Sequence, residues 1–196
     1  MENSSENKKV IVKKNRERVE EITNRIHQLI IEINKNSKNN QGQENFSDLF
    51  EEWLEIKKEC KSKNDFKNFI INLYKIIYEK TRENIKNYNG KSISYNYRLP
   101  KSFTEIGTEN RNFFDIVGTL RHEYAHSDPR FREPKYSVKF RELQYPEILE
   151  MFLGNRNEHS SVNEFQRLQI KLLMRFEDVM EILSKIIKNE LPPRKP

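Results

Sequence analysis

Glycine, proline and cysteine are scarce in this chain of 196 residues, and each shortage excludes a class of structure. Five glycines and seven prolines are too few for a sheet rich in tight turns, which favours long helices. The single cysteine, Cys60, excludes an internal disulfide and a zinc site built from cysteines. No apolar run approaches the roughly 18 residues that a membrane-spanning helix needs. We therefore expect an all-α protein without a membrane span.

The charge and the aromatic content bear on whether the chain folds. The net charge of +6 is a small difference between 36 basic and 30 acidic residues. Disordered chains combine a large net charge with few aromatic residues, whereas this chain has 12 Phe and 8 Tyr. The first residues, 1–6, carry no apolar segment of the signal-peptide kind. We expect a folded, reduced and cytoplasmic protein.

Apolar residues recur at spacings of three and four along most of the chain, which predicts amphipathic helices. Together they predict a single helical bundle of four to five main helices over residues 10–190. A capping box of Asp48 and Glu51 marks the start of the second helix, which would bury Leu49, Phe50, Trp53, Leu54 and Ile56. The predicted helices cover about 10–36, 47 onward, 65–88, 109–126, 146–153 and 161 onward.

Three segments lack apolar anchors and are predicted to lie outside the bundle. These are a flexible N-terminus at 1–9, an exposed polar loop at 34–46 and a flexible C-terminal tail at 191–196. Residues 91–108 are less regular, and we expect an ordered loop there.

Two of the four histidines fall within six residues, Arg121-His122-Glu123-Tyr124-Ala125-His126. One interpretation is the helical zinc-protease pattern, in which histidines at i and i+4 bind zinc and the glutamate acts as general base. Against it, Ser-Asp-Pro follows at 127–129, the chain offers almost no strand, and the best third ligand, Glu164, is explained as a helix-capping residue. This interpretation is the weakest of those we weigh.

The other interpretation takes the string LRHEYAHS at 120–127, which resembles the signature of the HEPN superfamily. That signature has an arginine, then a polar residue, then a histidine four to six positions beyond the arginine. Arg121, His122 and His126 match it, as do the small residue Ala125 before His126 and Ser127 after it. The resemblance covers about eight residues, and HEPN domains are small all-helical bundles.

The resemblance implies a metal-independent endoribonuclease that needs no cofactor and acts as a homodimer with a composite active site. Histidine titrates near neutral pH and suits proton transfer, and the arginine fork matches a phosphate. It assigns His126 as general acid/base, Arg121 as the group that stabilises the scissile phosphate, and His122 as a supporting residue. Families of this kind serve in toxin–antitoxin or antiphage defence, so an antitoxin or another defence protein is an implied partner.

Basic residues alternate with aromatic ones directly after this motif, and we expect Arg130, Arg132 and Lys135 to bind RNA. A solvated loop edge explains that segment about as well. Arg121 and His126 could also serve only to satisfy carbonyls at a helix C-terminus. The main alternative function is a non-catalytic helical module that binds RNA or a protein. Elsewhere we expect Trp53 in the core, His27 at its edge and Cys60 half-buried.

Overall fold

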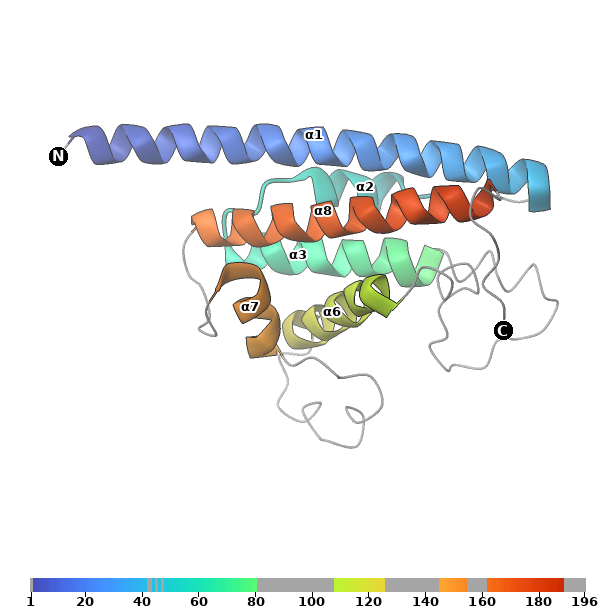
Figure 1. Cartoon of the computed structure of the whole chain (residues 1–196). Coiled ribbons are helices and arrows are strands. Elements are labelled where there is room, and N and C mark those ends of the chain that lie inside the picture. Colours follow the sequence, from blue (N-terminus) through green and yellow to red (C-terminus); the bar gives the residue numbers. More distant parts are fainter. Residues whose placement is uncertain are drawn as a thin grey trace.

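The computed structural model describes residues 2–41, 44, 46, 48–80, 108–125, 145–154 and 162–188. Within these ranges the regular elements are all helices, which confirms the all-α class (Figure 1). The number of main helices in the bundle stays a prediction, because residues 81–107 and 126–144 lie outside the described ranges. The elements are α1 (Glu2–Gln41), α2 (Phe50–Lys57), α3 (Lys63–Tyr74), the π-helix η1 (Lys75–Lys80), α6 (Thr108–Ala125), α7 (Tyr145–Leu153) and α8 (Val162–Ile187).

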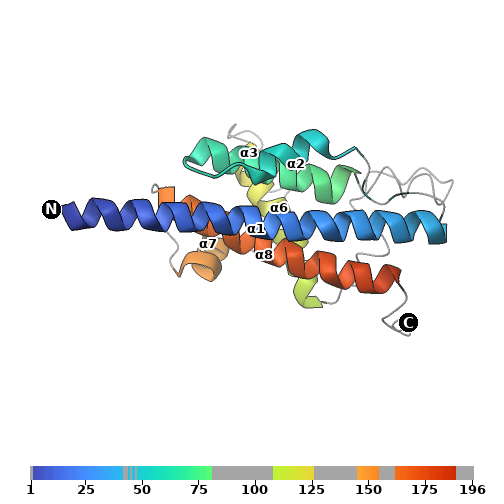
Figure 2. The same ribbon diagram turned by 90° about the horizontal axis from the view of Figure 1, so that it is seen from above.

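Helix α1 is longer at both ends than its apolar pattern predicts. It begins at Glu2, so the predicted flexible segment 1–9 is helical from its second residue. Its N-terminal part runs past the end of the bundle in both views (Figures 1 and 2). The basic residues of this part therefore stand on an extended helical arm.

The predicted exposed loop at 34–46 is wrong in its first half, because α1 continues to Gln41. Ile33 and Ser37 are buried, which packs the last turns of the helix. The Asn34 side chain also pairs with the backbone of Phe46, whose N–H donates to Asn34 Oδ1 at 2.8 Å. Asn34 Nδ2 in turn donates to the Phe46 carbonyl. Phe46 is 2% exposed, so this polar segment has an apolar anchor after all.

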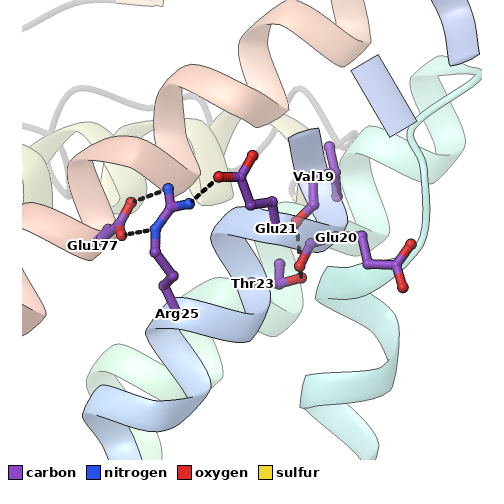
Figure 3. Close-up of polar contacts among 6 residues, drawn as sticks. All are labelled: Val19, Glu20, Glu21, Thr23, Arg25 and Glu177. Atoms are coloured by element: carbon purple, nitrogen blue, oxygen red, sulfur yellow. Dashed lines mark hydrogen bonds and ion pairs between the residues drawn. The ribbon is translucent and has the colours of Figure 1, made fainter. Parts of the chain in front are cut away.

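Helices α1 and α8 lie side by side and form the main interface of the bundle (Figures 1 and 2). Their apolar faces meet, and the predicted buried positions from Val19 to Ile33 and from Phe165 to Leu183 are confirmed, with Leu29 partly buried. Arg25 on α1 donates two hydrogen bonds to the Glu177 carboxylate on α8 and a third to Glu21 (Figure 3). This bidentate ion pair fixes the register of the two helices at the edge of the apolar contact.

The predicted start of α2 is wrong. The helix begins at Phe50, and its N-cap, Leu49, makes no side-chain capping bond. Asp48 has a φ of 55°, whereas a capping residue takes an extended conformation. Trp53 and Ile56 are buried as predicted, but Phe50 and Leu54 are 74% and 48% exposed. An eight-residue helix on the surface of the bundle buries only one narrow side.

Helix α3 begins with a side-chain cap, because the Ser62 hydroxyl accepts a hydrogen bond from the Asp65 N–H at 3.1 Å. Its predicted buried face from Phe66 to Ile77 is confirmed. After Tyr74 the helix widens into η1, whose π-type turn holds one more residue than an α turn. Such insertions occur frequently at functional sites. The predicted end of this helix near residue 88 lies outside the described ranges.

Two buried glutamines of α8 hold the connection between α2 and α3. Gln169 accepts a hydrogen bond from the Cys60 N–H at 3.0 Å and donates to the carbonyls of Ile56 and Lys58 at 3.3 and 2.7 Å. Gln166 donates to the Glu59 carboxylate. These bonds satisfy backbone groups that the end of α2 leaves buried.

Helices α6 and α7 agree closely with the predicted ranges 109–126 and 146–153, and α8 begins one residue after the predicted start at 161. None of the helices in the described ranges is both long and apolar enough to cross a membrane. The predicted tail at 191–196 and the predicted loop at 91–107 lie outside those ranges.

Candidate functional site

The C-terminal half of α6 carries the motif, and its buried face decides where each motif residue lies. Phe113, Phe114, Ile116, Val117 and Leu120 are buried as predicted. Successive residues of an α-helix are about 100° apart, so the next residues turn outward from this face. Arg121 and His122 are half-buried and Glu123 is exposed, whereas Tyr124 returns to the core at 7% exposure.

The Arg121 guanidinium lies over the ring of Tyr74, with its carbon 4.7 Å from the ring centre. Tyr74 is the last residue of α3, and its side chain is largely buried at the point where η1 begins. Arg121 makes no ion pair with any residue that the structure describes. The contact with Tyr74 therefore holds an arginine at the surface while its charge is left uncompensated by a nearby carboxylate of the described residues.

Tyr124 ties the end of α6 to the start of α3. Its ring meets Phe66 edge-on, with centroids 5.3 Å apart and an interplanar angle of 78°. Lys63 Nζ lies 6.0 Å from the same ring. Contacts one turn apart, at Arg121 and at Tyr124, thus dock the last turn of α6 on both ends of α3.

The structure describes only part of the predicted site. Arg121 and His122 lie together on the last turn of α6, as their adjacency requires. His126 follows directly after the last described residue of α6, so its position relative to Arg121 stays a prediction. The predicted RNA-binding residues Arg130, Arg132 and Lys135 also lie outside the described ranges.

The residues of the zinc interpretation are likewise only partly described. Within the described ranges no three His, Cys, Asp or Glu side chains group closely enough to hold a metal ion. His126 is not in those ranges, whereas Glu164 is half-buried in the first turn of α8.

Tyr74 is a residue that the sequence interpretation did not single out. Its partner Arg121 is far away in the chain, and no local spacing connects the two. The only signal was an aromatic residue next to the apolar stripe of a predicted helix.

The remaining predictions concern residues outside the motif. Trp53 is in the core, and His27 stacks on it with centroids 5.1 Å apart, which confirms its position at the core edge. Cys60 is fully buried rather than half-buried, because the Gln169 staple pulls its backbone inward. Burial, together with the nearby carboxylates of Asp65 and Glu59, raises the pKa of the Cys60 thiol well above its usual value. This cysteine is therefore a structural residue without nucleophilic character.

Comparison of the chain with protein-family models, curated proteins and solved structures gives no match. The functional argument therefore depends on residues 120–127 and on the described geometry of Arg121.

Proposed function

We propose that this protein is a metal-independent endoribonuclease of the HEPN type, with Arg121 and His126 as its central residues. The observation that supports the proposal best is the contact between Arg121 and Tyr74. An arginine held on an aromatic ring, without a carboxylate partner among the described residues, is suited to receive a phosphate.

Arginine has five N–H donors in a planar fork, and the ring of Tyr74 offers them no oxygen acceptor at its face. Two phosphate oxygens can therefore accept from this fork in the bidentate manner. In RNA cleavage the negative charge on these oxygens grows as the pentacovalent phosphorane forms. A fixed guanidinium stabilises that state more than the ground state, which lowers the barrier.

The chemistry needs no metal ion. The 2′-oxygen attacks the adjacent phosphorus, the bond from phosphorus to the 5′-oxygen breaks, and the products are a 2′,3′-cyclic phosphate and a 5′-hydroxyl. One proton leaves the 2′-hydroxyl and one arrives at the 5′-oxygen, and these transfers are the role of His126. His122, next to Arg121, supports the site as a polar neighbour.

Attack and departure occur on opposite sides of the phosphorus, so a single histidine does not reach both oxygens well. Two copies of the chain related by a two-fold axis would bring one His126 to each side. The proposal therefore includes a homodimer with a composite active site, and sedimentation equilibrium of the whole chain measures it. The setting that the motif implies is cytoplasmic toxin–antitoxin or antiphage defence, with an antitoxin or another defence protein as possible partner. Arg130, Arg132 and Lys135 would hold the RNA beside the motif.

The test is RNA cleavage in EDTA by the wild-type protein and by Arg121→Ala and His126→Ala. Arg175→Ala is the matched control, because Arg175 is an exposed arginine on α8. We expect cleavage to persist in EDTA, to be lost in the first two variants and to be kept in the control.

Two results would overturn the proposal. Activity that EDTA abolishes and zinc restores would assign the motif to a zinc hydrolase. RNA binding without cleavage of any RNA would assign the protein to the non-catalytic binding modules.

A further inference from the structure

The arm of α1 carries cations on a helix that has left the bundle (Figures 1 and 2). Lys13, Lys14, Arg16 and Arg18 are all exposed. Glu17 is the one acidic residue between them, and it pairs with Lys13 at 4.0 Å. The other three cations have no ion-pair partner among the residues that the structure describes.

A surface groove of about 610 Å³ lies where this arm meets the bundle. One wall is α1, and the other is the connection from α2 to α3 that the buried glutamines hold. The cations that line it are Arg16, Lys57, Lys58 and Lys61, and the acids are Glu20, Glu59 and Asp65.

Two of these acids are already engaged within the protein. Glu59 accepts from Gln166 and pairs with Lys61 at 3.1 Å. Asp65 accepts from the Ser62 hydroxyl at 2.8 Å and from the Lys61 N–H at 3.1 Å. Arg16 and Lys57, by contrast, make no ion pair within the described part of the chain. The charge that the groove offers to a ligand is therefore positive.

The pattern around the arm disfavours two other occupants. At about 100° per residue, Val10 falls between Lys13 and Lys14, and Ile11 falls beside Arg18. A helix that lies in a membrane surface needs its apolar residues gathered on one face, and these are not. A second copy of the arm would bring cations against cations. The remaining partner is a chain of negative charges that tolerates scattered apolar groups.

The groove also leads toward the candidate site. Its lining ends at Lys61 and Asp65, and Lys63 between them lies over Tyr124 in the last turn of α6. Arg121 lies one turn earlier on the same helix. Cations thus extend from the arm of α1, over the turn before α3, to the end of α6.

We infer that an arm-and-groove surface, separate from the motif, binds the phosphate backbone of a single RNA strand. Its residues are Lys13, Lys14, Arg16, Arg18, Lys57 and Lys61. Backbone binding depends on charge and is independent of sequence, as a row of lysine and arginine without a built pocket implies. That the strand then reaches Arg121 rests on the proposed function, whereas binding itself does not.

The test is the affinity of the whole chain for a labelled single-stranded RNA of about 20 nucleotides, measured by fluorescence anisotropy from about 50 to 200 mM salt. The test variant is Arg16→Gln/Lys57→Gln. The control, Lys35→Gln/Lys185→Gln, removes the same charge from exposed sites at the other end of α1 and α8. Losing two phosphate contacts should weaken binding several-fold and reduce the slope of log K against log salt by about 1.4. The control should change neither.

Equal affinity and slope in the test and control variants would overturn the inference. So would binding to vesicles of anionic lipid by a protein that does not bind the RNA. RNA binding that depends on Arg16 and Lys57, in a protein that cuts no RNA, would support the surface and refute the nuclease. Cleavage that depends on Arg121, with binding unchanged in the test variant, would do the reverse.

Discussion

The guanidinium of Arg121 on α6 lies 4.7 Å from the centre of the Tyr74 ring, the last residue of α3 before the helix widens into a π turn. The two residues are far apart in sequence and meet because α3 and α6 pack together. If Arg121 stabilises a phosphate, Tyr74 is the residue that positions it.

Replacing Tyr74 tests this positioning. Tyr74→Phe keeps an aromatic face, so we expect RNA cleavage within about twofold of the wild type. Tyr74→Leu keeps an apolar side chain but removes the face, and a cation–π loss of about 1 to 2 kcal/mol predicts a fall of about tenfold. The fall should be in kcat rather than in KM, because the contact aims Arg121 at the transition state. Melting temperatures of both variants provide the control for folding. Equal activity of the two variants would remove Tyr74 from the account.

The Gln169 staple predicts a large effect on stability. Gln169→Leu leaves the Cys60 N–H and the carbonyls of Ile56 and Lys58 without their partner. Unpaired buried groups cost about 1 to 3 kcal/mol each, so we expect a loss of about 3 kcal/mol in urea unfolding. Lys171→Leu, at an exposed position of the same helix, should change stability by less than about 0.5 kcal/mol. A loss below 1 kcal/mol for Gln169→Leu would show that the connection is held by other contacts.

Cys60 predicts the reactivity of the native thiol. Its pKa is raised by burial and by the carboxylates of Asp65 and Glu59, and its side chain is fully buried. A thiol reagent at pH 8 should therefore label the native protein only through unfolding, at a rate that rises with urea as global stability falls. Gln169→Leu should label faster in proportion to its lost stability. Rapid labelling of the native wild type would contradict the buried position.

Glu32 predicts a small acid-dependent term in stability. The hydrogen bond from Lys188 holds the pKa of this carboxyl below its usual value, against the opposing effect of burial, with a smaller contribution from Ser184. A folded-state pKa below the unfolded one stabilises the protein above the unfolded pKa and is lost as the pH falls through the folded one. Because the Glu32 side chain is 42% exposed, we expect less than about 1 kcal/mol. The difference in unfolding free energy between wild type and Glu32→Gln should shrink from pH 7 to pH 3. A difference that grows over this range would reverse the sign.

Most of the fold could be predicted from the sequence, because the apolar spacing of three and four is a local signal. The buried faces of α1, α3, α6 and α8 follow it closely. The errors arise where the deciding contact is distant in sequence. Asn34 pairs with the backbone of Phe46, and this extends α1 into a segment whose composition predicts a loop. On α2, Phe50 is exposed because one side of a short helix is enough to cover its neighbours.

The candidate site was predictable only as a string of letters. The spacing of Arg121 and His122 on one helix turn is a local property, and α6 bears it out. The ring under Arg121 and the groove between α1 and the turn before α3 depend on packing between distant segments. Buried glutamines such as Gln169 look like surface residues in a sequence, since nothing local shows which backbone groups they will meet.

The central claim is that the 2′-hydroxyl of RNA attacks its own phosphate beside Arg121, and one measurement tests it directly. An RNA that the protein cuts is compared, in EDTA, with the same RNA carrying a single 2′-deoxy residue at the scissile position. The account predicts a 2′,3′-cyclic phosphate end from the first, no cleavage at that position of the second, and no product from either with Arg121→Ala. Cleavage of the deoxy-substituted position, or a cut that Arg121→Ala leaves intact, would contradict it.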